Sequence, residues 1–344
     1  MQIEDLWDSL EADATAGRAG NSGWLIRLAR PAAGCPLFVG LELASRRRAV
    51  LLRLPSATIP TRRLWPRSKG LEPLAIVVDG KPHFGVALKE SRFADVFTAL
   101  AEDLVRRVTE AGDPAAQARV FLAQLARWKK FLSASFDGLT EKAQRGLWGE
   151  LHFLRERLLP LLKAAAVNAW KGGERAHQDF QFGGGAIEVK TTLAKQPQIV
   201  RITSERQLDN SSWPLLLLNV VALEVREGGG ETLPAMIASL RSRLAGDLAA
   251  QEQFEDELLL SGYLDAHSVR YSDRGYIVRS ATTFQIKTSF PRLVEKDLPV
   301  GIGDVNYGLA IAACAAFALN EDKLTNALSR LDAVAKHAKR RGNG

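Results

Sequence analysis

Short apolar runs alternate with polar residues over the first part of the chain. Residues 23–89 contain the runs GWLIRLA, PLFVGLEL, AVLLRLP, LAIVVDG and HFGVALK, separated by Pro, Gly and Arg clusters. Asp79-Gly80, between the last two runs, is typical of a hairpin turn. Helical patterns follow over residues 93–109 and 114–132. The pattern predicts one short helix and then an N-terminal β-rich domain, residues 1–110.

The middle of the chain has a different order of elements. Residues 140–227 read as a helix, a strand pair, a further strand, a short helix and a strongly apolar strand, LLLLNVVALEV. A run with so few polar residues is typical of a strand covered on both faces. We therefore expect a mixed-sheet core flanked by helices, residues 111–230.

The last part, residues 231–344, is predicted to be a helix-rich region that packs on this core. Two helical stretches, a strand pair within residues 276–289 and a C-terminal helical region follow the glycines at 228–230. The longest apolar run, residues 307–319, has about 13 residues, whereas a bilayer span needs roughly 20. We expect it to be a buried core helix, with no membrane contact. The predicted fold class is α/β (α+β).

Composition is compatible with an ordinary globular protein. The 344 residues are 46% hydrophobic and 25% charged, which provides enough apolar surface for a core. The two cysteines, Cys35 and Cys314, match no metal-ligand spacing. The acidic, amphipathic N-terminus does not resemble a secretory signal, so we expect a cytoplasmic location.

Basic residues are unevenly distributed. The formal net charge is +7, and residues 43–71 carry eight basic side chains and no acidic one. Such a segment can neutralise nucleic-acid phosphates, or it can be a solvated hairpin edge protected from aggregation. The candidate DNA contacts in this segment are Arg46, Arg47, Arg48, Arg62 and Arg63.

A helical pattern over residues 140–163 carries a candidate acid. Thr140 is the expected N-cap. Leucines recur at helical spacing and form an apolar stripe made of Leu147, Leu151, Leu154, Leu158 and Leu161. At about 100° per residue, Glu150 falls at the margin of this stripe. Its carboxylate should point toward the interior, where desolvation is costly unless a cation or donors meet it.

The strand pair HQDFQF-GGG-AIEVKTT carries further candidates. Alternation places Glu188 and Lys190 on one face of the second strand. The glycines at 183–185 permit positive φ and a tight reversal. If Gly184-Gly185 form a two-residue loop, Asp179 falls opposite Lys190 and all three side chains share a face. A three-residue loop would turn Asp179 away unless a bulge restored it.

Two carboxylates beside a lysine suit metal-dependent hydrolysis. Mg²⁺ commonly binds one or two carboxylates, with water and substrate phosphate completing its ligands. The ion acidifies bound water and offsets developing negative charge, and a lysine can hold or deprotonate the attacking water. The structural alternative is an ion pair between Glu188 and Lys190 on an exposed strand, which contributes little stability.

These residues resemble the PD-(D/E)XK nuclease superfamily, which has the restriction-endonuclease-like fold. The likeness rests on Glu150, on Asp179 and, after an eight-residue gap, on Glu188-Val189-Lys190, together with the order of helices and strands. More narrowly, GLWGEL, IEVK, FPRL, LPVGI and VNY resemble a bacterial family of PD-(D/E)XK motif proteins. That likeness covers most of the chain, and its members tend to be encoded in phage-defence and restriction-like loci.

The resemblance implies a role for each matching residue. Asp179 and Glu188 would hold Mg²⁺, for which Mn²⁺ would substitute. The main-chain carbonyl of Val189 would add a ligand, and Lys190 would orient the water.

The resemblance implies two supporting residues as well. Glu150 would position the first ion or bind a second one. Gln207 stands where some members place a glutamine on the next helix. The sequence departs from the motif at Gln178, which replaces the proline before the first aspartate.

The leading hypothesis is a Mg²⁺-dependent DNA endonuclease subunit of a bacterial restriction-type or phage-defence system. Lys171, Arg175 and Lys195 are further candidate contacts to double-stranded DNA. The resemblance implies ATPase and DNA methyltransferase subunits as partners, and cutting both strands would suit a homodimer. The alternative is a catalytically silent DNA-binding or assembly module with the same fold.

Overall fold

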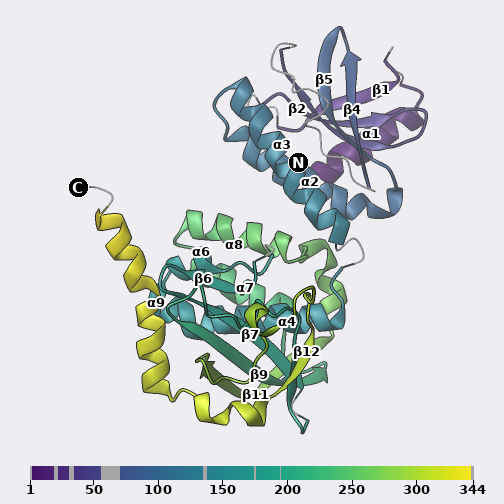
Figure 1. Ribbon diagram of the computed structural model, residues 1–344. Coiled ribbons are helices and arrows are strands. Elements are labelled where there is room, and N and C mark those ends of the chain that lie inside the picture. The colour runs from purple at the N-terminus through teal and green to yellow at the C-terminus, as the bar shows by residue number, and fades with distance from the viewer. Residues whose placement is uncertain are drawn as a thin grey trace. The chain divides into compact units, whose positions relative to one another are not determined.

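The computed structural model describes residues 2–18, 22–30, 35–55, 70–134, 138–173, 176–193 and 195–341. It has the mixed α/β fold that the sequence predicts (Figure 1). The chain forms two compact units, Met1–Asp137 and Gly138–Gly344. We call these unit 1 and unit 2. The first unit extends past the predicted boundary at residue 110, and the second holds the predicted core from residue 138 onward together with the C-terminal region.

Unit 1 contains an antiparallel sheet with the strand order β1-β2-β3-β5-β4. Its strands are β1 (Trp24–Leu28), β2 (Leu37–Glu42), β3 (Arg48–Arg53), β4 (Leu71–Val78) and β5 (Lys81–Leu88). The predicted hairpin turn joins β4 to β5, with Asp79 and Gly80 both at positive φ. Such a turn matches the twist of the strands that it connects.

Helices cover one face of this sheet. They are α1 (Ile3–Thr15), α2 (Ala94–Thr109) and α3 (Pro114–Ala134). The rings of Trp7 and Phe97 lie 5.5 Å apart between α1 and α2, and those of Phe84 and Phe121 lie 5.1 Å apart between β5 and α3. Because α2 and α3 pack on each other and on this sheet, a boundary at residue 110 would divide one hydrophobic layer.

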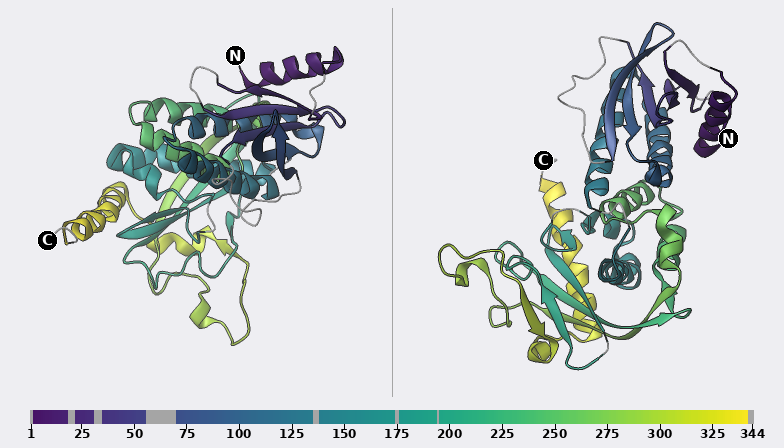
Figure 2. Two further views of the ribbon diagram at one scale, coloured as in Figure 1. Left: turned by 90° about the horizontal axis from the view of Figure 1, so that it is seen from above. Right: turned by 90° about the vertical axis from the view of Figure 1, so that its right-hand side faces the viewer.

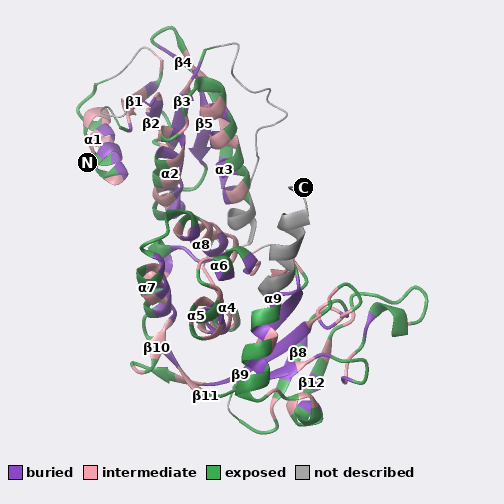
Figure 3. Ribbon diagram, turned by 90° about the vertical axis from the view of Figure 1, so that its left-hand side faces the viewer, coloured by how far each residue is buried: buried purple, intermediate pink, exposed green. Residues whose placement is uncertain are grey.

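Unit 2 is built on a mixed sheet with the order β10-β11-β9-β7-β6. These strands are β6 (Phe180–Phe182), β7 (Gly185–Leu193), β9 (Leu216–Glu227), β10 (Glu231–Thr232) and β11 (Arg274–Gln285). β7 and β9 run parallel, and the other pairs are antiparallel. The first eight residues of β9 are buried, as expected for a strand covered on both faces, and Figure 3 shows this burial along β9. A separate two-stranded sheet pairs β8 (Ile199–Ile202) with β12 (Tyr307–Ala310).

Helices α4 (Glu141–Phe153), α5 (Leu159–Leu162), α6 (Ala165–Ala169), α7 (Leu233–Leu244) and α8 (Leu248–Leu260) complete the main core of this unit. The helix predicted over residues 140–163 is interrupted, because Leu154–Leu158 form a π-helical turn. Its wider turn changes the phase of the residues that follow. Leu161, predicted to lie in the buried stripe, is therefore exposed.

Three local predictions in unit 2 are wrong. Residues 307–319 do not form a buried helix: they form β12 and a 3₁₀ segment, Ile311–Phe317, in which only Cys314 is buried. The expected strand pair within 276–289 is one long strand, β11. The expected short helix before β9 is a turn at residues 205–208.

The last helix, α9 (Glu321–Arg341), packs beside the β6–β7 end of the sheet (Figures 1 and 2). Its buried leucines, Leu324, Leu328 and Leu331, join the same hydrophobic core as α4 and β7. No helix among the described residues is long and apolar enough to cross a membrane.

Candidate active site

The β6–β7 hairpin brings the first aspartate beside the second acid. Phe182 pairs with Gly185 and Phe180 with Ile187, so residues 183 and 184 form the two-residue loop instead of 184 and 185. Continuing this register by one residue places Asp179 opposite Glu188, where the sequence predicted Lys190. Glu188 is two residues from Lys190 and therefore lies on the same face of β7, so Asp179, Glu188 and Lys190 still share one face.

Among the glycines at 183–185, Gly184 and Gly185 are needed because other main-chain segments approach them closely, and not because they adopt positive φ. None of the three lies in the left-handed region. A Cβ on Gly184 would lie 2.7 Å from the carbonyl oxygen of Arg330 in α9, and one on Gly185 would lie 2.1 Å from that of Leu215. The main-chain N–H of Gly184 donates to the carbonyl of Leu331 at 3.1 Å. The glycines thus let α9 pack directly against the hairpin.

Glu188 is the centre of the polar cluster. Its side chain is 1% exposed, and Oε1 forms an ion pair with Nζ of Lys190. Nε2 of Gln207 donates to the same oxygen at 2.8 Å. The other oxygen, Oε2, is buried and has no hydrogen-bond partner in the described structure. A buried carboxylate oxygen without a partner is costly, so this atom is suited to an additional ligand.

Asp179 and Glu150 are each held by one donor. Oδ2 of Asp179 accepts from the main-chain N–H of Val189 at 2.7 Å, and Oε2 of Glu150 accepts from Nε1 of the buried Trp170 at 2.9 Å. Gly149 lets α4 approach β7 closely, because a Cβ there would lie 2.2 Å from Cγ2 of Thr191. The contacts with Val189 and Trp170 therefore fix the positions of Asp179 and Glu150, respectively.

The acids influence one another electrostatically. Burial, together with the charge of Asp179, raises the pKa of Glu188 to about 8. The same causes raise the pKa of Glu150 well above its usual range, and burial raises the pKa of Asp179 although Lys190 opposes it. Burial disfavours the charge on Lys190, but Glu188 and Asp179 outweigh it and raise the pKa of the ammonium. Three acids around one cation leave the cluster short of positive charge.

The donor set fits a hydrated Mg²⁺ ion held by two carboxylates. Among the described residues, no group of three or more His, Cys, Asp or Glu side chains is placed to hold a metal. Mg²⁺ does not need such a group, because it keeps several waters and commonly uses one or two carboxylates. Asp179 and Glu188 meet that requirement, and the unpartnered Oε2 of Glu188 supplies an oxygen of the type that Mg²⁺ prefers.

The predicted basic contacts of unit 1 are already engaged where the structure describes them. Arg48 pairs with Glu4 at 2.7 Å and with Glu11 at 3.1 Å, and Arg47 pairs with Glu42 and Glu72. Nη1 of Arg46 donates to the carbonyl of Glu11 at 3.4 Å. The two further candidates, Arg62 and Arg63, lie outside the described residues.

The basic candidates of unit 2 lie nearer in sequence to the acids. Lys195 is exposed just after β7. The main-chain N–H of Lys171 donates to the carbonyl of Asp179 at 2.7 Å. Arg175 lies outside the described residues. Arg206, in the turn that carries Gln207, pairs with Glu295 at 3.3 Å.

Comparison with known protein families shows to which family this chain belongs. A family model described as "Putative PD-(D/E)XK family member, (DUF4420)" matches residues 3–312. The chain belongs to this family. No curated protein and no solved structure was found to match it. The match includes both units and every candidate site residue, but not α9.

Two residues of this PD-(D/E)XK family member were not predicted from sequence as part of the site. Trp170 holds Glu150, and its only sequence signal is an aromatic residue before the glycines at 172 and 173. Gln178 is 4% exposed, and its Nε2 donates to the carbonyls of Arg206 and Gln207 at 2.9 and 3.2 Å. Its departure from the motif proline was visible in the sequence, but its partners were not.

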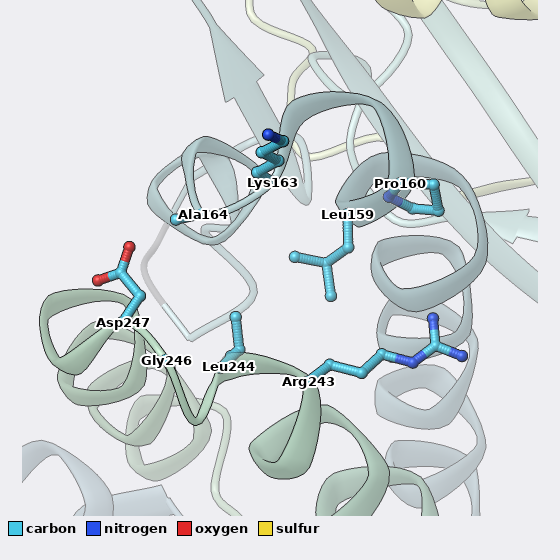
Figure 4. Close-up of a pocket in the computed structure, with 8 residues that line it drawn as sticks. All are labelled: Leu159, Pro160, Lys163, Ala164, Arg243, Leu244, Gly246 and Asp247. Atoms are coloured by element: carbon cyan, nitrogen blue, oxygen red, sulfur yellow. The ribbon is translucent and has the colours of Figure 1, made fainter.

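A pocket of about 370 Å³ in unit 2 lies apart from these residues. It is lined by Leu159, Pro160, Lys163, Ala164, Arg243, Leu244, Gly246 and Asp247. Figure 4 shows Leu159 and Leu244 facing each other across it. None of the site acids lines it, so the candidate active site is the carboxylate cluster and not this pocket.

Proposed function

We propose that this PD-(D/E)XK family member is a Mg²⁺-dependent DNA endonuclease. The observation that carries the proposal is the polar cluster on the β6–β7 hairpin. Asp179, Glu188 and Lys190 share one face, and one buried oxygen of Glu188 has no hydrogen-bond partner among the residues that the structure describes. Family membership supports the same chemistry.

Each residue of the cluster has a part in phosphodiester hydrolysis. Asp179 and Glu188 would hold Mg²⁺, or Mn²⁺ in its place, because both are hard ions that prefer oxygen ligands. The carbonyl of Val189 would supply one more oxygen. The ion would acidify a bound water and offset charge on the phosphate. Lys190 offers N–H donors that would orient this water beside the ion.

Glu150 and Gln207 would support this arrangement. Burial and the nearby charge of Asp179 raise the pKa of Glu150, so a cation bound beside it would offset this shift and favour its ionised form. Gln207 holds one oxygen of Glu188 by its hydrogen bond and leaves the other available. Both side chains therefore act on the carboxylates that would bind the metal.

Double-stranded DNA is the substrate that we infer. Lys195 is exposed directly after the strand that carries Glu188 and Lys190, where it would contact a phosphate. By the resemblance to defence-locus proteins, we place the enzyme in a restriction-type or phage-defence system, with ATPase and methyltransferase subunits as partners. Cleavage of both strands would need two sites, which a homodimer would provide.

The experiment is plasmid cleavage with Mg²⁺ by the wild type and by Asp179→Asn, Glu188→Gln and Lys190→Met. We expect each variant to lose about a hundredfold or more in rate. Glu141→Gln, an exposed acid at the start of the helix that carries Glu150, is the matched control and should cut normally. Equal cleavage by the wild type and the three site variants would refute the proposal.

Metal binding gives a second measure in case cleavage requires partner subunits. Mg²⁺ should raise the melting temperature of the wild type and of Glu141→Gln, but not that of Asp179→Asn or Glu188→Gln. DNA binding that is unchanged by EDTA, with no metal-induced shift and no nicking, would favour the silent DNA-binding module instead.

A further inference from the structure

We infer that Gln178, the residue in place of the motif proline, is a positioning residue that fixes Gln207 on Glu188. The inference rests on the proposed nuclease function for its kinetic consequence, but not for its geometry. Gln178 lies immediately before Asp179 and is 4% exposed. A buried carboxamide must find partners, and its partners indicate its role.

The side chain of Gln178 reaches a turn distant in sequence. Its Nε2 donates to the carbonyl oxygens of Arg206 and Gln207 at 2.9 and 3.2 Å. Residues 205–208 form a turn, in which the carbonyl of Arg206 also accepts from the main-chain N–H of Asp209 at 3.3 Å. Gln178 adds a second donor to the carbonyl of Arg206 and a donor to the carbonyl of Gln207, and it thereby ties this turn to the segment before β6.

The side chain of Gln207 is oriented by a separate pair of donors. Its Oε1 accepts from the main-chain N–H of Thr203 at 2.9 Å and from the Thr203 hydroxyl at 3.2 Å. Since two donors face Oε1, the amide nitrogen must face the other way, toward Glu188. Nε2 then donates to Oε1 of Glu188 at 2.8 Å.

These contacts close a ring through the site. Gln178 holds the backbone of Gln207, Gln207 holds Glu188, and the next residue after Glu188 donates its N–H to Asp179. The ring joins the two candidate metal-binding acids through their sequence neighbours. A proline at 178 could make none of these side-chain hydrogen bonds, because its ring carries no carboxamide or other polar group.

The test is a double-mutant cycle with Gln178→Leu and Gln207→Leu. Each single variant should lower kcat by roughly tenfold or more with KM for DNA unchanged, because Gln178→Leu loses two hydrogen bonds to carbonyls and Gln207→Leu loses the bond to Glu188. If Gln178 acts through Gln207, the double variant should be no slower than Gln207→Leu alone. Multiplying effects in the double variant would overturn the inference.

Two further variants separate positioning from folding. Gln178→Glu keeps the size of the side chain but cannot donate to carbonyls, so it should be as slow as Gln178→Leu. Gln178→Pro restores the residue that names the motif, and it should still lose activity. His177→Ala, at the exposed neighbouring position, is the control. Full activity in Gln178→Pro would contradict the inference.

A measurement on the protein without substrate distinguishes failure of this inference from failure of the proposed function. In ¹⁵N-labelled protein, the side-chain amide of Gln207 can be assigned by its absence in Gln207→Leu. We expect Gln178→Leu to shift this signal and speed its hydrogen exchange at least tenfold. An unchanged signal would overturn the inference whether or not the wild type cuts DNA. Absent cleavage with a shifted signal would count against the nuclease proposal alone.

Discussion

Glu150 shows how closely one side chain can be constrained by residues that have no charge. Its Oε2 accepts from Trp170, and the neighbouring glycine, Gly172, leaves space for that contact. A Cβ at position 172 would lie 2.3 Å from Oε2 of Glu150 and 2.6 Å from Nε1 of Trp170. The main chain here approaches the acid as closely as a residue without a side chain permits.

Gly172→Ala should therefore displace the carboxylate of Glu150. We expect the rate of DNA cleavage to fall by about tenfold or more, because small misplacements of catalytic groups are costly. Gly146→Ala is the control: a Cβ at 146, in α4, has no atom within 4 Å. That change should leave activity intact and stabilise the helix by about 0.5–1 kcal/mol. The test is to measure melting temperature and cleavage rate for both variants. Normal cleavage by Gly172→Ala would show that the close approach of Gly172 does not position the carboxylate of Glu150.

His83, in unit 1, is also a buried ionisable side chain, but it has no part in the proposed chemistry. It lies on β5 and is 2% exposed, with Nδ1 2.9 Å from the carbonyl of Lys81 and Nε2 unpartnered in the described structure. Burial lowers its pKa from the ordinary value of 6.5. The folded state therefore keeps this imidazole neutral at pH values where the unfolded chain would protonate it.

This difference predicts acid sensitivity in unit 1. Because the folded pKa is lowered, the stabilisation is fully present above about pH 6.5 and is lost as the pH falls through the folded value. Urea unfolding of the wild type between pH 7.5 and 5 should show this loss. His83→Phe should reduce the pH dependence, whereas His177→Phe, at an exposed position, should not. Identical pH profiles for wild type and His83→Phe would disprove the assignment.

At the scale of elements, α9 is the support on which the β6–β7 hairpin depends. Leu324, Leu328 and Leu331 are buried in the core that also holds β7 and α4. Arg157, in the π-helical turn, pairs with Glu321 at the start of α9 at 2.7 Å. The helix thus buries apolar surface at one end of the sheet and contacts the glycine loop at the same place.

Leu328→Ala should test this support. Removing a fully buried leucine leaves a cavity, so we expect unit 2 to lose about 2–5 kcal/mol of unfolding free energy. Ser329→Ala, one residue further along the same helix and exposed, should change stability by less than about 0.5 kcal/mol. Chemical denaturation provides the comparison. Equal stability of the two variants would show that α9 does not contribute to the core.

Sequence predicted the elements whose signals are local and failed where distant residues decide. Alternation in β7 identified the shared face of Glu188 and Lys190, but the loop register was undetermined, because Gly183 and Gly184 can form the turn as well as Gly184 and Gly185. A short apolar run such as 307–319 does not distinguish helix from strand. The carboxylates that pair with Arg47 and Arg48 come from other elements, so the charge pattern alone suggested a free basic surface.

At the scale of the molecule, every residue of the candidate site belongs to unit 2. In the described part of the chain, two hydrophobic clusters of unit 2 are made of residues from 139 onward, and a cluster on the sheet of unit 1 is made of residues before 90. Each unit therefore has apolar surface of its own to bury, which is the usual condition for independent folding.

Residues 138–344 expressed alone should fold. We expect cooperative thermal unfolding, and the same Mg²⁺-induced rise in melting temperature as in the whole chain, because Asp179 and Glu188 are retained with their partners. Circular dichroism and calorimetry would measure both. A fragment that is unfolded or aggregated would show that unit 1 is needed for the fold of unit 2.

The contact between Gly184 and Leu331 also orders events during protein synthesis. The hairpin with Asp179 and Glu188 leaves the ribosome long before the helix whose carbonyl accepts from its loop. A nascent chain that still lacks α9 thus contains Glu150, Asp179 and Glu188, but it lacks the helix that packs against the β6–β7 hairpin. The positions of these acids would therefore be fixed only after residue 331 has been synthesised and α9 has packed against the hairpin.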